Sequence, residues 1–223
     1  MKKQILSIAS IALVAGALVM SGCKKDDITA PEITLVGDAT VNVDFKGTYT
    51  DGGATANDDR DGDLTTKVVV SNPVVTTSAE TYTVTYNVSD EAGNAASEAT
   101  RTVNVVIKGA NMAGTYSVKD DVGGTIATYP ETITVSGADA NKIIVAKFAN
   151  YTNGQVNMTI SGTNGTTVTI PNQTVSCGLP PNVASRQFSG SGTIAKDGKT
   201  MTLNYTEVTG GTTVTGIETY TLQ

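Results

Sequence analysis

Histidine and tryptophan are absent from this chain of 223 residues, and cysteine occurs only twice. Without histidine, the chain cannot form a Ser-His-Asp triad, a Cys-His dyad or a histidine-containing catalytic zinc site. Charged residues make up 16% and aromatic residues 5% of the chain, and the net charge of −6 argues against binding nucleic acid by counterion release. Threonine, by contrast, is about one residue in six. Because β-branched side chains fit pleated strands better than helices, this composition predicts an all-β protein.

The first 22 residues have the pattern of a secretory signal peptide. Lys2 and Lys3 precede an apolar run over residues 5–20, and small residues follow it. The end of the run, Met20-Ser21-Gly22-Cys23, resembles a lipobox, which implies cleavage before Cys23 and acylation (palmitate) of its sulfur. Two or three acyl chains anchor a protein stably where one is marginal. The sequence therefore predicts a lipoprotein with residues 1–22 removed; the alternative is an uncleaved membrane anchor.

The residues after the lipobox predict where the protein is displayed. Lys24, Lys25, Asp26 and Asp27 resemble the surface-export signal that follows the acylated cysteine in outer-membrane lipoproteins of the Bacteroidota. The resemblance implies an outer-membrane lipoprotein facing the cell exterior, with residues 23–27 as its tether; the alternative is a solvated charged tether without a signal. Since lipid would occupy Cys23, Cys177 has no partner for an intramolecular disulfide.

Residues 28–108 predict a β-sandwich. Apolar and polar residues alternate strictly over residues 81–88, as expected for a strand with one core face and one solvent face. In a partner strand over residues 102–107, Val103, Val105 and Ile107 alternate with Thr102, Asn104 and Val106. With the remaining candidate strands there are about seven, a number typical of an immunoglobulin-like (Ig-like) domain. The other candidates are 29–35, 41–43, 48–56, 67–70 and 74–76.

Several motifs in this segment resemble one family. They resemble, in order and spacing, the bacterial Ig-like domain named after a pesticidal crystal protein, which implies an Ig-like fold and a role as spacer rather than a particular activity. The motifs are Thr29-Ala30-Pro31-Glu32-Ile33-Thr34-Leu35, Tyr49-Thr50-Asp51-Gly52-Gly53-Ala54-Thr55-Ala56, Asp61-Gly62-Asp63-Leu64-Thr65, Thr81-Tyr82-Thr83-Val84-Thr85-Tyr86 and Ala92-Gly93-Asn94-Ala95.

The aspartate-rich loop at residues 57–63 is the candidate metal site. An EF-hand is excluded, because its twelfth position would fall on Val68 instead of a glutamate. In an Ig-like topology, however, this loop and the final hairpin lie at the same end as the N-terminus, which could also bring Asp27 close, and clustered carboxylates there could bind Ca²⁺. The predicted ligands are Asp58, Asp61, Asp63 and Asp90. The alternative is that these residues cap turns, as short polar side chains commonly do.

Residues 109–111 predict a linker, and residues 112–223 a second all-β domain. Eight strand-like segments separated by glycine-containing turns favour an up-and-down barrel, which has no open sheet edges. Ala113-Gly114-Thr115-Tyr116 and Glu218-Thr219-Tyr220-Thr221-Leu222 resemble the ends of a lipocalin-like barrel. The alternative is a second β-sandwich. The segments are 114–119, 125–135, 142–147, 155–161, 166–170, 188–195, 200–205 and 215–222.

One long irregular segment is expected in the second domain, from Pro171 to Arg186. Loops of this length are often functional, so it is a candidate lid over a barrel mouth; alternatively, its prolines only stiffen a wide connection. Tyr129 and Tyr151 are expected at strand ends or in loops, where they could offer stacking faces or simply pack.

The sequence favours a binding role over catalysis. The carboxylates of the second domain form no recognisable motif, and we expect no enzyme activity. The leading hypothesis is a surface lipoprotein whose Ig-like spacer presents a domain that binds a small ligand or glycan; the alternative is a scaffold or assembly lipoprotein that binds another envelope protein. The carboxylates of the second domain are Asp120, Asp121, Glu131, Asp139, Asp197, Glu207 and Glu218.

Overall fold

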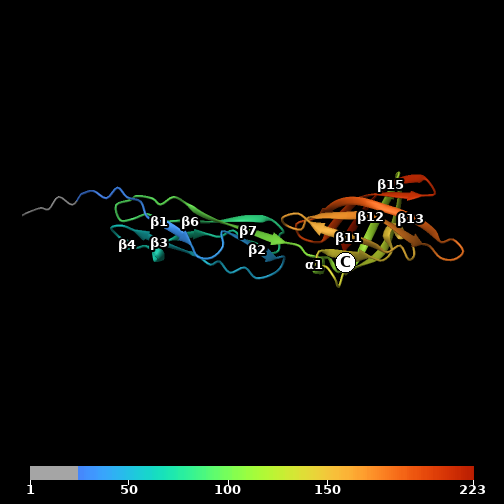
Figure 1. Cartoon of the computed structure of the whole chain (residues 1–223), viewed down its shortest axis with the longest axis horizontal. Helices are drawn as coiled ribbons and strands as arrows, with labels where there is room; N and C mark the ends of the chain where they lie inside the picture. The colour runs from blue at the N-terminus through green and yellow to red at the C-terminus, as the bar shows by residue number, and fades with distance from the viewer. Residues whose placement is uncertain (1–24) are drawn as a thin grey trace, which may run out of the picture.

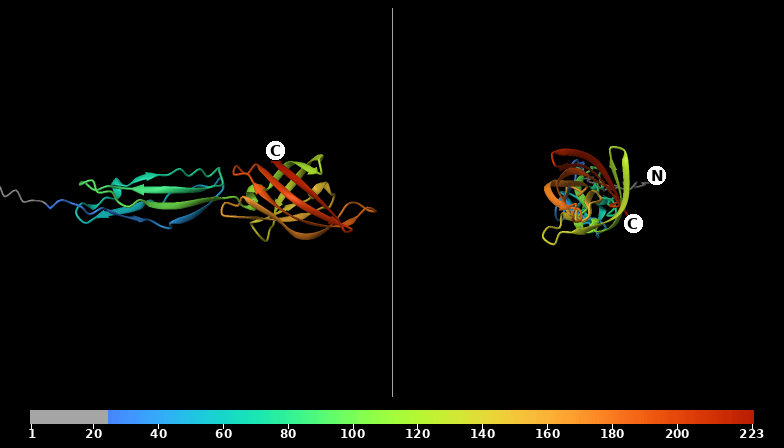
Figure 2. Two further views of the ribbon diagram at one scale, coloured as in Figure 1. Left: turned by 90° about the horizontal axis from the view of Figure 1, so that it is seen from above. Right: turned by 90° about the vertical axis from the view of Figure 1, so that its right-hand side faces the viewer.

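The computed structural model describes residues 25–223, which form two all-β domains placed end to end (Figures 1 and 2). The predicted signal peptide, the lipidation site Cys23 and the export-signal residue Lys24 lie outside the described residues. From residue 25 onward, no helix combines the length and apolar character needed to cross a membrane.

The N-terminal domain is a sandwich of two sheets, and its seven strands confirm the predicted Ig-like architecture. β2 and β7 pair in parallel, while the other neighbouring strands are antiparallel. A 3-10 helix, η1 (Thr65–Lys67), joins β4 to β5. One sheet has the order β1 (Glu32–Leu35), β3 (Ala54–Asp58), β4 (Gly62–Asp63), and the other β2 (Thr40–Asp44), β7 (Ala99–Val106), β6 (Thr81–Asn87), β5 (Val69–Ser71).

The alternation over residues 81–88 gives the sandwich its core. Val84, Tyr86 and Val88 are buried, whereas the residues that alternate with them, Thr83, Thr85 and Asn87, face outward. Two strand predictions need correction: residues 74–76 form no strand, and the third strand begins at Ala54 instead of residue 48. Residues 76–78 form a turn where the chain reverses direction. The short apolar pairs that precede this turn along the chain gave no indication of it.

A buried arginine holds one part of the sandwich together. The Arg101 side chain is 2% exposed and forms an ion pair with Asp51, whose Oδ1 also accepts hydrogen bonds from the hydroxyls of Tyr49 (2.8 Å) and Tyr86 (2.6 Å). Arg101 Nη2 donates to the carbonyl oxygen of Val36 at 2.6 Å. A charge removed from water in this way requires such partners, because its desolvation is costly.

The C-terminal domain is a closed antiparallel barrel of eight strands, which confirms the predicted barrel and not the second sandwich. Each strand pairs with the next along the chain, and the last strand, β15, pairs with the first, β8. Closure leaves no sheet edge free to pair with another chain. The strands are β8 (Gly114–Val122), β9 (Thr125–Val135), β10 (Lys142–Val145), β11 (Val156–Ser161), β12 (Thr167–Cys177), β13 (Ala184–Ile194), β14 (Thr200–Thr209) and β15 (Thr212–Leu222).

The segment from Pro171 to Arg186 is not the irregular lid that its composition suggests. β12 and β13 run through most of it, and only residues 178–183 form the connecting loop. Pro171 is tolerated in the strand because the pairing of β12 with β13 shifts register between Ile170 and Gln173. At such a bulge the backbone N–H that proline lacks is not needed for the ladder.

The two domains touch through several hydrogen bonds. The predicted linker forms most of a short helix, α1 (Gly109–Met112), whose Gly109 N donates to Ala140 O at 2.8 Å. Asn164 accepts from Ile107 N at 2.9 Å through its carbonyl oxygen, and Ala79 N donates to Lys196 O at 2.8 Å. These bonds tie the end of the sandwich and the short helix to three turns of the barrel.

Candidate functional site

Four carboxylates of the second domain lie inside the barrel. Asp120, Glu131, Glu207 and Glu218 are each no more than 6% exposed. Each is two residues away from a buried apolar or tyrosine side chain on the same strand, so the alternation of the strand turns it inward. Glu131 is satisfied by backbone, since its two oxygens accept from the N–H groups of Thr132 and Lys147 at 2.7 Å each.

Glu218 is the most deeply buried of these acids. Its Oε1 accepts from the Tyr129 hydroxyl at 2.6 Å and from Ala149 N at 2.8 Å, and its Oε2 accepts from the Tyr220 hydroxyl at 2.6 Å. Burial raises the pKa of Glu218 to about 7, despite these hydrogen bonds to its charged form. The carboxyl group therefore exchanges its proton near neutral pH in the interior of the barrel.

Asp120 accepts a hydrogen bond from Tyr205, and Gly216 leaves room for the ring of this tyrosine. The Tyr205 hydroxyl donates to Asp120 Oδ1 at 3.1 Å, and burial raises the pKa of Asp120. The Tyr205 ring lies against Gly216, where an added Cβ would come within 2.5 Å of ring atoms. Gly216 is thus required for the tyrosine to reach the aspartate across the interior.

An arginine, a glutamate and a tyrosine form the third polar group. Arg186 makes an ion pair with Glu207, which also accepts from the Thr209 hydroxyl at 3.0 Å and from the Tyr151 hydroxyl at 3.4 Å. The Arg186 guanidinium carbon lies 4.0 Å from the centroid of the Tyr151 ring, a cation–π contact. The buried Arg186 Nε has no hydrogen-bond partner among the described residues.

The Asp120–Tyr205 pair and the group of Arg186, Glu207 and Tyr151 line a cavity of about 460 Å³ that opens at one mouth of the barrel. Cavities of similar size, about 470 and 610 Å³, lie on the outer wall of the barrel and between the domains. We take the mouth as the candidate site because buried charged groups line it, as at many ligand sites. Its lining comprises Asp120, Val122, Ala149, Tyr151, Arg186, Tyr205, Glu207, Thr209, Thr212 and Val214.

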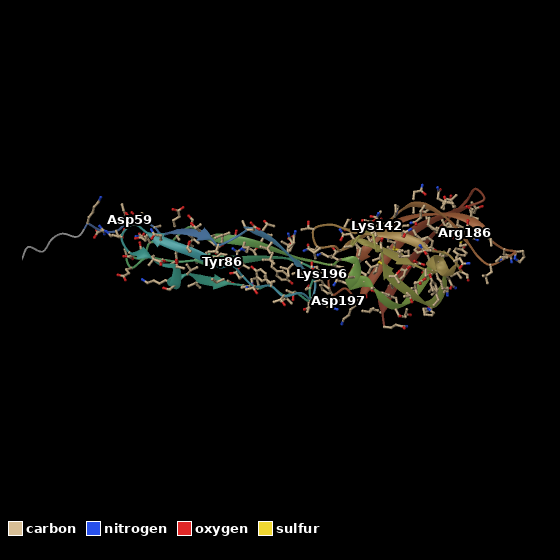
Figure 3. All side chains as sticks on the ribbon, turned by 60° about the horizontal axis from the view of Figure 1, so that its bottom comes forward. Asp59, Tyr86, Lys142, Arg186, Lys196 and Asp197 are labelled. Atoms are coloured by element: carbon tan, nitrogen blue, oxygen red, sulfur yellow. The ribbon has the colours of Figure 1, made fainter. Side chains whose placement is uncertain are left out.

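The candidate site lies at the end of the barrel that faces away from the Ig-like domain. Figure 3 shows Arg186 near the far end of the molecule, whereas Lys196 and Asp197 lie at the junction of the domains. The chain path explains this arrangement, because β8 starts beside the linker and reaches Asp120 near its other end. The cavity is therefore at the point of the barrel most distant from the N-terminal tether.

The predicted metal ligands lie at the opposite end of the molecule, and the structure divides them. Asp61 Oδ2 accepts from Glu91 N at 2.7 Å, Asp63 Oδ1 accepts from Thr65 N at 2.9 Å, and Asp90 accepts two hydrogen bonds from Asn94. Hydrogen bonding from Thr65 lowers the pKa of Asp63. Asp58 instead lies in a group with Asp27 and Asp59, whose carboxylate oxygens are within 4.8 Å of one another.

Of the predicted export-signal residues, Lys25, Asp26 and Asp27 are described. Lys25 and Asp26 are exposed, and the Lys25 carbonyl oxygen accepts a hydrogen bond from Arg60 at 2.5 Å. In the other domain, Cys177 is buried beside the mouth, and burial raises the pKa of its thiol. A neutral, buried thiol is a poor nucleophile.

Sequence reasoning did not identify Asp120, Arg186, Glu207 or Glu218 as site residues. A usable signal was present, because each acid is in phase with the apolar residues of its strand: Asp120 follows Val118, and Glu218 precedes Tyr220, by two positions. An acid on the core face of a strand is unusual and marks a buried polar site. Of the two tyrosines singled out, Tyr151 lines the cavity and Tyr129 binds Glu218 below it.

Comparison with known proteins identifies the first domain. Residues 33–105 match the family of bacterial surface protein Ig-like domains, in agreement with the predicted Ig-like fold. No curated protein matches the sequence. Two solved structures are similar at low identity. A lipoprotein from Bacteroides thetaiotaomicron is 17% identical over 85% of this chain and 98% of its own, with a TM-score of 0.34. A candidate outer membrane protein from Bacteroides fragilis is 11% identical over 87% and 94%, with a TM-score of 0.34.

Proposed function

We propose that this protein, whose first domain is a bacterial surface Ig-like domain, is a non-catalytic lipoprotein of the outer membrane, facing the cell exterior. The Ig-like domain acts as a spacer, and the barrel binds a small, neutral, hydroxyl-rich ligand such as a short glycan in its distal mouth. The observation that carries the proposal is the cavity of about 460 Å³ lined by Asp120, Glu207 and Arg186. An anchor at Cys23 would place this mouth at the end farthest from the membrane.

The chemistry of the mouth favours a neutral ligand rich in hydroxyl groups. Carboxylates accept hydrogen bonds from hydroxyls, and Asp120 and Glu207 offer such acceptors on the wall of the cavity. Two acids against one arginine give the mouth a net negative charge when both are ionised, which opposes an anionic ligand. Glu207 and Arg186 hold each other in place, so the acceptor geometry exists before the ligand arrives.

The same contacts support a role in binding and not in catalysis. Glu207 is engaged by Arg186, and Asp120 by Tyr205, so the acids that line the mouth have structural partners. Glu218, whose pKa burial raises to about 7, is fully buried beneath the mouth and is not part of the cavity lining.

The experiment is a binding screen of the full chain against short neutral oligosaccharides, followed by calorimetric titration of any that bind. Asp120→Asn should weaken binding about tenfold or more, equivalent to about 1.4 kcal/mol. Asp121→Asn is the matched control, because Asp121 is the next residue on β8 and lies outside this cavity lining. Equal affinity of wild type and D120N, or equal losses in both variants, would contradict the proposed site.

One observation favours a second candidate function, docking of an envelope protein. Leu179 and Val183 in the β12–β13 loop are 60% and 51% exposed. Large apolar side chains exposed together can anchor a protein partner, although a stable interface needs about 800 Å² per partner. Replacing both with serine should abolish capture of such a partner and leave oligosaccharide binding unchanged.

A further inference from the structure

The tip of the Ig-like domain holds an aspartate whose charge is only partly satisfied. Asp58 ends β3 and is 3% exposed. Its Oδ1 accepts hydrogen bonds from the backbone N–H groups of Arg60 and Asp61, at 2.9 Å each. Its Oδ2 is buried and has no donor anywhere in residues 25–223. A buried carboxylate oxygen without a hydrogen-bond partner is unfavourable, and a positively charged ligand would satisfy it.

Two further carboxylates meet Asp58 at this point. Asp27, from the segment before β1, and Asp59, the next residue in the turn, each place an oxygen within 4.8 Å of the other two. Carboxylates this close repel one another. Arg60 offsets part of the charge, since its Nε lies 3.9 Å from Asp27 Oδ2, but it supplies one positive charge against three negative ones.

We propose that Asp27, Asp58 and Asp59 bind a calcium ion. Calcium binds six to eight oxygen atoms at 2.3–2.6 Å, so two oxygens on opposite sides of the ion lie about 4.6–5.2 Å apart. The three carboxylate oxygens lie within 4.8 Å of one another, no farther apart than two ligands of one calcium ion can be, and the unpartnered Asp58 Oδ2 becomes a ligand. Water completes the coordination, because Asp59 is exposed to solvent. Magnesium is disfavoured, since it needs a near-ideal octahedron at about 2.1 Å.

This ligand set differs from the one expected from the sequence. Asp58 is common to both, but Asp61, Asp63 and Asp90 accept hydrogen bonds from neighbouring turns. Asp27 replaces them and comes from a different part of the chain, 31 positions before Asp58. Only the folding of residues 25–28 onto the tip brings it there, aided by the hydrogen bond from Asn94 Nδ2 to Asp27 O at 3.1 Å.

The ion would join the start of the chain to the body of the domain. Arg60 and Asn94 already hold the carbonyl oxygens of Lys25 and Asp27 against the tip. Calcium adds a direct link from Asp27 to the β3–β4 turn. With lipid on Cys23, four residues earlier, such a link would fix the direction in which the domain leaves the membrane.

The test is calcium titration of the full chain after treatment with a chelator, by calorimetry and by thermal unfolding. Wild type should bind one Ca²⁺ and show a rise of several degrees in the melting temperature of the Ig-like domain, with a smaller rise in Mg²⁺. Asp59→Asn and Asp27→Asn should each abolish the rise. Asp59 is exposed, and Asp27, whose side chain is 9% exposed, lies before β1 and outside the hydrophobic core, so neither change should prevent folding.

Asp26→Asn is the matched control, because Asp26 adjoins Asp27, carries the same charge and lies outside the group. It should keep the full calcium response. The proposal is overturned if millimolar calcium leaves the wild-type melting temperature unchanged, or if D27N and D59N respond as wild type does. An equal loss in D26N would also overturn it, because the effect would then reflect net charge and not a site.

Discussion

Replacing Glu218 with glutamine should change how the stability of the barrel depends on pH. Glu218 is fully buried, and burial raises its pKa to about 7 in the folded protein, against 4.5 for a glutamate in water. Below pH 4.5 the group is protonated in both folded and unfolded chains. As pH rises from 4.5 to 7, Glu218 ionises in the unfolded chain but remains protonated in the folded one. This ionisation lowers the free energy of the unfolded state relative to the folded state. Glu218 therefore favours the folded state at acidic pH, and this contribution is lost by about pH 7.

The magnitude follows from the difference between the two pKa values. At about 1.4 kcal/mol for each tenfold change in proton affinity, the contribution of Glu218 amounts to about 3 kcal/mol. Glutamine has nearly the same shape but does not ionise in this range. The free energy of unfolding of Glu218→Gln, measured relative to wild type, should thus rise by about 3 kcal/mol between acidic and slightly alkaline pH.

Urea unfolding at several pH values, followed by near-ultraviolet circular dichroism, measures this difference. Five of the eight tyrosines belong to the barrel, so the signal reports mainly on that domain. Subtracting the free energy of unfolding of wild type from that of the variant cancels the contributions of the titrating groups that both proteins share. Parallel stability profiles for the two proteins would refute the reasoning, since they would mean that Glu218 ionises alike in the folded and unfolded chains.

Three further predictions concern the anchor, its signal and the Ig-like core. Cys23→Ala should release the protein from the membrane fraction, and retention there would contradict lipid anchoring. Replacing Lys24, Lys25 and Asp26 with alanine should keep the protein in the membrane but protect it from protease added to intact cells; continued cleavage would argue against an export signal. Arg101→Met should lower the free energy of unfolding of the Ig-like domain by about 3 kcal/mol, because a carboxylate loses its buried partner. Thermal unfolding measures this loss, and a change below about 1 kcal/mol would contradict it.

Local patterns predicted most of the strands. The alternation at residues 81–88 was sufficient for β6, and the segment 125–135 coincides with β9. The pattern failed where a strand departs from regular pairing. Pro171 looks like the start of a loop in sequence, yet it lies inside β12 because a bulge removes the need for its N–H.

What the sequence determined by itself is the class of each domain and the phase of its strands. Side chains two positions apart share a face, so the identity of inward and outward residues is a local property of the chain. The all-β composition, the Ig-like motifs and the eight turn-separated segments are likewise visible without any contact between distant residues.

Which residues meet was decided only by the tertiary structure. Tyr205 and Asp120 are 85 positions apart, and Tyr129 and Glu218 are 89 apart. They come together because β15 pairs with β8 and closes the barrel, which brings its first and last strands side by side. At the other end of the molecule, Asp27 reaches Asp58 because the segment before β1 folds onto the tip of the sandwich. Both polar groups thus depend on contacts between distant parts of the chain. The spacing of residues along the sequence does not predict such contacts.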